Sequence, residues 1–253
     1  MNGRNPGRVF EPPAETWRVR YAKRDRMRWA SHRDFQRSLE RGVRRAGIPM
    51  AFSAGFRPHP KISYAGAVPT GAGSEAEYLE LSTAVRIRSA VITSDLDEAL
   101  PAGFSIMEAF RSTGGSLAER LQASLWEVEV LGLPEEQLGE AVDAFLAAGE
   151  LPVERITKSG RRIVDARQPV LRFDARFEPD SKPQCAILDL ALTHATPSVR
   201  ATDVLAALWR VSGIGPKRAP RLTRMAQGPL VAGTGSVGDP LAPDRAGFLT
   251  PLS

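Results

Sequence analysis

The alternation of apolar and polar positions first becomes regular at residue 17. Residues 17–21 are Trp-Arg-Val-Arg-Tyr, a period of two that predicts a strand. A helix is predicted next, because Ser31 and Asp34 have the spacing of a capping box. Apolar residues then recur every three or four positions along one face: Phe35, Leu39, Val43 and Ala46. Gly47, with a proline two residues later, predicts the end of this helix.

Similar patterns continue to about residue 226. In the first half, further strands are predicted at residues 61–67, 78–83 and 104–110. One short helix is predicted at residues 95–100. The second half repeats this order, with helices predicted at residues 135–148 and 202–211. Its strands are predicted at residues 125–131, within 153–177, and at 184–193 and 220–225.

Both halves therefore have the order β-α-β-β-α-β. We predict an α+β protein of two tandem ferredoxin-like units, with domains at residues 16–115 and 120–227. The alternative is one larger α+β domain with similar local elements. Residues 1–15 and 228–253 are rich in small residues, Gly and Pro and have no sustained period, which predicts disordered tails.

Composition narrows the class of protein. The 253 residues are 42% hydrophobic and 25% charged, as in globular proteins, with no run of eighteen apolar residues and no signal-like start. A single cysteine, Cys185, excludes an intrachain disulfide and an Fe–S cluster held by this chain alone. His32, His59 and His194 lack zinc-ligand spacing. We expect a soluble cytoplasmic protein with no membrane association, metal or cofactor.

The positive charge is concentrated in one early segment. The chain has 34 Lys and Arg against 29 Asp and Glu, and a pI of about 9.8. Residues 17–61 have thirteen basic and three acidic residues, a net charge of +10, whereas residues 62–253 have a net charge of −5. A field of this kind steers an anionic partner toward one region.

Five arginines of the predicted helix are three or four residues apart or adjacent, so their side chains are expected on one ridge. We call this set the arginine ridge: Arg33, Arg37, Arg41, Arg44 and Arg45. Guanidinium groups bind phosphate bidentately, which makes the ridge a candidate nucleic-acid contact. The alternative is an ordinary solvated helix face, which Glu40 neutralises only in part.

The segment at residues 55–61 is a second candidate. Prolines on both sides of His59 favour extended backbone that holds the imidazole outward. We expect Arg57 and Lys61 to contact phosphate, and Phe56 and His59 to stack on a base. The alternative is a rigid turn without a binding role.

No catalytic residue is assigned, and His59 and His32 are the two candidates. Near the start of the predicted helix, His32 is either a structural histidine or faces the same site as His59. Three basic residues near a predicted hairpin turn form a weaker candidate for nucleic-acid contact: Lys158, Arg161 and Arg162. As on many exposed hairpins, they could instead favour solubility.

Two further motifs are weak. The segment at residues 71–74 resembles a phosphate-binding loop, but no Gly-Lys-Ser/Thr follows it. The segment at residues 211–219 resembles the turn of a helix-hairpin-helix motif, but Pro220 would break the second helix.

Several of these segments together resemble the radical-SAM-linked family, a bacterial domain of unknown function. The resemblance covers about residues 16–226 and rests on stretches in one order and spacing: Arg20-Tyr21-Ala22-Lys23, Ser31-His32-Arg33-Asp34, Arg44 to Pro49, Gly55 to Ser63 and Gly73 to Glu80. Two later stretches are less specific: Thr157 to Arg161 and Val164 to Arg167. Many members have Ser-His-Leu-Asp where this chain has Arg33.

The resemblance implies a partner, because the family is found beside or fused to B12-binding-type radical SAM proteins. With one cysteine, this chain is not that enzyme and resembles a free-standing accessory half. Our leading hypothesis is a non-catalytic RNA-binding accessory protein that acts with a radical SAM enzyme or RNA-processing machinery. The alternatives are a metal-independent RNA-cleaving or RNA-modifying enzyme using His59 or His32, and a protein-docking module for the radical SAM partner.

Overall fold

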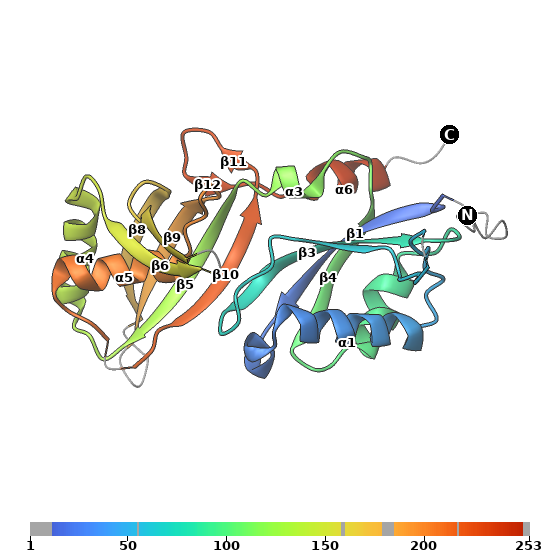
Figure 1. Cartoon of the computed structure of the whole chain (residues 1–253), viewed down its shortest axis with the longest axis horizontal. Helices are drawn as coiled ribbons and strands as arrows, with labels where there is room; N and C mark the ends of the chain where they lie inside the picture. Colours follow the sequence, from blue (N-terminus) through green and yellow to red (C-terminus); the bar gives the residue numbers. More distant parts are fainter. Residues whose placement is uncertain (1–11, 55, 158–159, 179–184, 217, 250–253) are drawn as a thin grey trace, which may run out of the picture. The chain divides into compact units, whose positions relative to one another are not determined.

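The computed structural model describes residues 12–54, 56–157, 160–178, 185–216 and 218–249. The chain forms two compact units. The first contains residues up to 70, residues 77–115 and the C-terminal residues from 241, and the second contains residues 71–76 and 116–240. Helices and strands alternate in both, so the protein is of the mixed α/β kind (Figure 1).

The first unit has four strands in the order β4-β1-β3-β2. The pairs β1–β4 and β2–β3 are antiparallel. The strands are β1 (Glu15–Lys23), β2 (Ile62–Ala65), β3 (Gly73–Thr83) and β4 (Phe104–Arg111). The helical segments are η1 (Asp25–Trp29), α1 (His32–Arg45), η2 (Val91–Leu96), α2 (Asp97–Ala99) and α6 (Ala242–Leu249).

Helix α1 begins where its sequence predicts. The Ser31 Oγ accepts the Asp34 N–H at 3.2 Å, and the Asp34 carboxylate accepts the Ser31 N–H at 3.0 Å, which confirms the capping box. The buried face of α1 packs on β1 and β4 through an apolar cluster that includes Trp17, Val19, Tyr21, Phe35, Leu39, Val43 and Phe104. The opposite face of α1 is left to solvent.

The other face of this sheet carries α6. Because side chains alternate along a strand, Arg18 points away from the core formed by Trp17 and Val19. Its guanidinium is fully buried and contacts Asp244 of α6. Figure 1 shows α1 and α6 on opposite sides of the β1–β3–β4 sheet.

The second unit has the strand order β10-β5-β9-β8. These strands are β5 (Ala123–Leu131), β8 (Val170–Glu178), β9 (Cys185–Thr193) and β10 (Arg221–Gly228). Gly73 and Ser74, the first residues of β3, belong to this unit and pair in parallel with β10, so the sheet is mixed. Helices α4 (Glu135–Ala147) and α5 (Ala201–Ser212) pack on each other, and α4 packs on β8.

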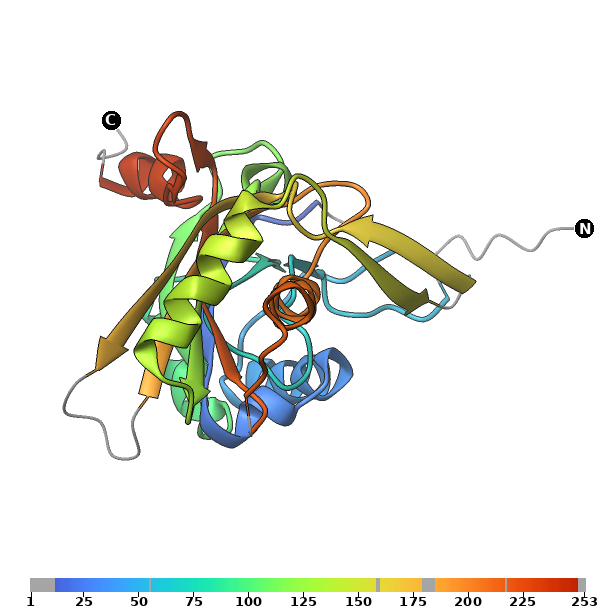
Figure 2. The same cartoon turned by 90° about the vertical axis from the view of Figure 1, so that its left-hand side faces the viewer.

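Two small hairpins and a short helix complete the second unit. Strands β6 (Pro152–Thr157) and β7 (Gly160–Asp165) pair only with each other, and Figure 2 shows this yellow hairpin apart from the larger sheet. The second hairpin joins β11 (Leu230–Val231) to β12 (Ser236–Val237). Helix α3 (Leu117–Arg120) precedes β5.

The prediction of a disordered tail from residue 228 is wrong for residues 229–249, which contain β11, β12 and α6. The composition of this segment, rich in Gly and Pro, gives no sign that two of its side chains, Leu241 and Asp244, are fully buried and anchor it. At the other end, Ala14 and Glu15 are also ordered, since the Ala14 N–H donates to the Thr83 carbonyl and Glu15 starts β1. Residues 1–11 and 250–253 lie outside the described residues.

Candidate nucleic-acid interface

All five residues of the arginine ridge are exposed along α1. At about 100° per residue, Arg33, Arg37, Arg41 and Arg44 lie within an arc of about 80°, and Arg45 lies about 40° beyond it. The buried residues of the helix occupy the other side: Phe35, Leu39, Gly42 and Val43. The structure therefore brings the five predicted arginines onto one solvent-facing ridge.

The ridge is not neutralised by ion pairs. Three of its guanidinium groups donate to neutral oxygens: Arg41 to Ser38 Oγ (3.4 Å), Arg44 to the Glu40 carbonyl (3.2 Å) and Arg45 to the Ala99 carbonyl (3.0 Å). Within the described part of the chain, none of the five forms an ion pair with a carboxylate.

The one carboxylate at the start of the ridge is engaged in the helix cap. Hydrogen bonds from the Ser31 side chain and backbone are the main cause that lowers the pKa of Asp34, and the charges of Arg37 and Arg33 lower it further. Asp34 therefore remains ionised at neutral pH and is used by the cap.

The loop after α1 holds its aromatic and basic side chains outward. Phe56 is 100% exposed, and Arg57, His59 and Lys61 are exposed as well. The loop is closed at its base, because the Ser53 N–H donates to the His59 carbonyl at 2.9 Å and the His59 N–H donates to Ser53 Oγ at 3.2 Å. Gly55 lies outside the described residues.

The two candidate catalytic histidines have separate surroundings. His59 Nδ1 lies 2.8 Å from Ser53 Oγ. His32 Nε2 lies 3.1 Å from the Gln36 amide nitrogen, and the His32 ring meets the Tyr64 ring edge-on at 4.8 Å. No hydrogen bond or ring contact joins His32 to His59. The arrangement does not form a histidine pair.

The third histidine has a structural role. His194 Nδ1 lies 2.8 Å from the Leu121 carbonyl, and its Nε2 lies 3.0 Å from Ser124 Oγ, which accepts the Trp126 indole N–H. Desolvation of these ring nitrogens is the main cause that lowers the pKa of His194, and the charge of Arg224 adds to it. Its hydrogen bonds fit a neutral ring.

Two of the three basic residues predicted on the hairpin, Arg161 and Arg162, lie in β7. Arg161 forms an ion pair with Glu154 across β6 and β7 at 3.2 Å, and both side chains are more than half exposed. Arg162 is exposed without an ion pair among the described residues. Lys158, the third predicted contact, lies outside the described residues.

The two weak motifs have structural explanations. Gly73 and Ser74 are buried in strand β3, so residues 71–74 do not open a helix at a phosphate site. Helix α5 ends at Gly213, whose left-handed backbone (φ of 70°) closes it, and strand β10 follows from Arg221. A second helix of a helix-hairpin-helix motif is therefore not present there.

Two exposed aromatic side chains, one before α1 in the chain and one after it, are not among the residues predicted from the sequence. Trp29 is 69% exposed and Phe52 is 50% exposed. The signal for Trp29 was its position in Arg-Asp-Arg-Met-Arg-Trp, where basic residues alternate with others directly before the helix. Aromatic residues interleaved with basic ones are typical of surfaces that bind single-stranded nucleic acid.

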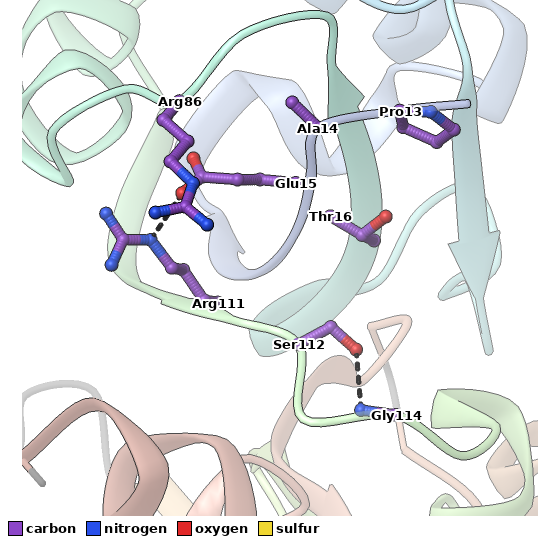
Figure 3. A pocket seen from close by; sticks show the side chains of 8 residues that line it. All are labelled: Pro13, Ala14, Glu15, Thr16, Arg86, Arg111, Ser112 and Gly114. Atoms are coloured by element: carbon purple, nitrogen blue, oxygen red, sulfur yellow. Dashed lines mark hydrogen bonds and ion pairs between the residues drawn. The ribbon is translucent and has the colours of Figure 1, made fainter. Parts of the chain in front are cut away.

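The first unit also has a cavity of about 440 Å³ at the start of β1 (Figure 3). Its two guanidinium groups, Arg86 and Arg111, point toward the carboxylate of Glu15. That carboxylate pairs with Arg111 Nε at 2.8 Å and accepts the Ile87 N–H at 3.1 Å. Glu15 thereby ties the 86–88 segment to β1, which is a structural function.

No group of three or more His, Cys, Asp or Glu side chains in the described residues is arranged to hold a metal ion. In the same residues, no helix has the length and apolar character needed to cross a bilayer.

Comparison with curated proteins finds no match. Among solved structures, a chain in the crystal structure of a Cbf5–Nop10–Gar1 complex is 10% identical, with a TM-score of 0.47. The match covers 83% of this chain and 48% of the other, so this chain spans about half the length of that one. An encapsulated DyP-type peroxidase from Mycobacterium smegmatis is 12% identical, with a TM-score of 0.22 and coverage of 87% and 93%. Neither likeness bears on function.

The family comparison covers most of the chain. Residues 17–201 match the model of a family described as an uncharacterized protein conserved in bacteria, DUF2344. The matched segment contains α1 and its arginine ridge, the 55–61 loop and the β6–β7 hairpin. This chain belongs to that bacterial family.

Proposed function

We propose that the protein is a non-catalytic RNA-binding accessory protein and that the phosphate backbone of the RNA lies along the arginine ridge. One observation carries the proposal: five exposed arginines share the solvent face of α1, and none is paired with a carboxylate in the described residues. Unpaired guanidinium groups at this spacing favour a ligand with repeated negative charges.

The 55–61 loop supports the same ligand. Phe56 and His59 offer two ring faces for bases, and Arg57 and Lys61 add positive charge beside them. The hairpin residues Arg161 and Arg162, with Lys158, remain a proposed second phosphate contact.

The test is RNA affinity across a salt series. We expect log Kobs to fall linearly with log salt, with a slope of about −0.7 to −0.9 for each phosphate contact. Five phosphate contacts along the ridge predict a total slope of about −3.5 to −4.5. A protein that binds no structured or single-stranded RNA, or binds an uncharged polymer equally well, contradicts the proposal.

We also propose that the protein works with a radical SAM enzyme or RNA-processing machinery, as the family resemblance implies. The test is copurification of the native protein before and after nuclease treatment. A radical SAM protein that copurifies only before nuclease treatment is joined to this protein through RNA that both bind. Retention after it favours the alternative of a direct protein-docking module.

The enzyme alternative rests on His59, whose Nδ1 is held by Ser53 Oγ while its ring stays exposed. A histidine oriented in this way can act as a general base in metal-independent RNA cleavage. This alternative predicts RNA cleavage in the presence of a chelator that is lost in His59→Ala or His32→Ala. Intact RNA after incubation with the wild-type protein contradicts it.

For the fold, we propose two tandem ferredoxin-like units. The order β4-β1-β3-β2 in the first unit corresponds, strand for strand, to β10-β5-β9-β8 in the second once the β6–β7 hairpin is set aside. In both, a helix follows the first strand and helical residues precede the last one. This repetition supports the β-α-β-β-α-β order twice along the chain.

A further inference from the structure

Trp29 is an exposed indole at the start of the arginine ridge. It is the last residue of η1, two positions before the N-cap Ser31, and 69% of its surface is accessible. Figure 1 shows η1 as the dark blue turn that leads into α1. The other tryptophans are buried or half-buried: Trp17, Trp126 and Trp209.

The backbone beneath Trp29 is fixed. The Arg24 N–H donates to the Gly103 carbonyl at 2.7 Å, and the Met27 N–H and Ala30 N–H close the turn at 2.9 Å. Met27 and Ala30 pack against the core of the first unit, and Trp29 between them is turned to solvent. Binding of a partner at Trp29 therefore does not require the backbone of this turn to become ordered.

The exposed aromatic residues and the positive charge occupy the same stretch of chain. Among the side chains that the structure describes, the exposed aromatic ones are Trp29, Phe52 and Phe56. All three fall within residues 17–61, where the net charge is +10. This coincidence of ring faces and unpaired arginines is the composition of a single-strand binding surface.

The sheet of this unit is not available as the stacking surface. Its face opposite α1 carries the buried ion pair of Arg18 with Asp244, and Arg245 of α6 lies over the Phe110 ring at 5.1 Å. Aromatic contact with a base must therefore come from outside that face. Trp29 is the largest exposed ring in the described residues.

We infer that Trp29 is a base-stacking residue and that the ligand of the arginine ridge is single-stranded RNA. This inference rests on the proposed function. Stacking on an indole requires a base that is not already stacked within a duplex, so an unpaired strand fits this site and a continuous duplex does not. Helix α1 has 14 residues, a length of about 21 Å. At about 3.4 Å per stacked nucleotide, the ridge from Arg33 to Arg45, about 18 Å long, accommodates about five nucleotides.

Tryptophan and arginine are also enriched at the centres of protein–protein interfaces. The five arginines of the ridge, none paired with a carboxylate in the described residues, favour a polyanion over a protein here, because a phosphate backbone supplies a regular series of negative charges along the helix. Binding of a protein partner through Trp29 is therefore an alternative that the experiment below distinguishes from the inference.

The experiment compares three probes with the full-length protein: an oligouridylate of about 12 nucleotides, an RNA duplex of about 12 base pairs, and inorganic polyphosphate, which has the charge but no bases. The variants are Trp29→Ala and Trp29→Phe. Val85→Ala is the matched control, since Val85 is an apolar side chain that is 52% exposed and lies outside the proposed contacts. Circular dichroism and melting temperature establish that each variant folds.

We expect Trp29→Ala to weaken oligouridylate binding by about 5- to 150-fold, the range for the loss of one stacked base. Trp29→Phe should restore most of the affinity, and Val85→Ala should leave it unchanged. Polyphosphate affinity should be the same in all variants. Oligouridylate should also quench indole fluorescence in the wild-type protein and not in Trp29→Phe.

Three results separate the possibilities. If the wild-type protein binds none of the three probes, the proposed function fails and the inference fails with it. If the wild-type protein binds oligouridylate and Trp29→Ala binds it equally well, only the inference is overturned, and Trp29 is then a candidate protein anchor. Folded Trp29→Ala could also lose polyphosphate binding to the same degree as oligouridylate binding. Trp29 would then support the arginine ridge and not stack on a base, which also overturns the inference.

Discussion

The guanidinium of Arg18 in β1 is joined to the carboxylate of Asp244 in α6 by two contacts, of 3.0 Å and 3.1 Å, across 226 residues of sequence. Both side chains are buried. Asp244 also accepts the Thr113 N–H at 2.8 Å, and Arg18 Nε donates to Glu80 at 2.8 Å. A C-terminal segment that is rich in Gly and Pro is thereby part of the first unit.

We predict that Asp244→Asn destabilises the protein by about 1.5–3 kcal/mol, because it removes a buried charge-assisted contact and leaves the Glu80 carboxylate paired with Arg18. Urea unfolding measures the loss. The matched control is Glu154→Gln, which breaks the exposed Arg161–Glu154 pair and should cost about 1 kcal/mol or less. Equal losses in the free energy of unfolding for the two substitutions would show that burial of the Arg18–Asp244 pair does not determine how much it stabilises the protein.

The arginine ridge predicts a graded change in salt dependence. Each of Arg33→Gln, Arg37→Gln and Arg41→Gln should lower the slope of log Kobs against log salt for single-stranded RNA by about 0.7, since each removes one phosphate contact. Arg172→Gln is the control, because Arg172 in β8 is exposed and already paired with Asp174 at 3.1 Å. An unchanged slope in the triple variant would remove α1 from the interface.

His194 predicts a loss of stability on acidification. Its pKa in the folded protein is lowered from the ordinary 6.5, first by desolvation of the ring, so between these two pKa values the unfolded chain binds more protons than the folded one. Stability is therefore fully present above pH 6.5 and decreases as the pH falls toward the folded pKa. Thermal unfolding of the wild type and of His194→Gln between pH 8 and pH 5 measures this, and the variant should show a weaker pH dependence. Parallel curves for the two proteins would contradict the prediction.

Alanine substitutions at two glycines are predicted to change the stability in opposite directions. A Cβ at Gly228 would overlap the carbonyl oxygen of Gly238, a backbone atom, so Gly228→Ala should destabilise the second unit by about 1–3 kcal/mol. A Cβ at Gly139 in α4 meets no atom within 4 Å, so Gly139→Ala should stabilise the helix by about 0.5–1 kcal/mol. Urea midpoints of both variants give the sign. Stabilisation by Gly228→Ala would mean that the β11–β12 segment does not pack against Gly228.

Local elements of this protein could be predicted from its sequence because their signals lie within a few residues. The capping box at Ser31 and Asp34 sets the start of α1, and its apolar positions face one side. The same spacing that buries Phe35, Leu39 and Val43 requires Arg37 and Arg41, which lie between them in the sequence, to face solvent. The exposed ridge therefore follows from the sequence alone, and so does the concentration of positive charge near it.

Only the tertiary structure decided which distant residues meet. No local pattern shows that Asp244 neutralises Arg18, because a buried ion pair between residues 226 positions apart depends on the path of the whole chain. The exposure of Trp29 is decided in the same way, since Met27 and Ala30 occupy the core positions beside it. Periodicity assigns a residue to a face of its own element, and packing between elements determines whether that face is covered.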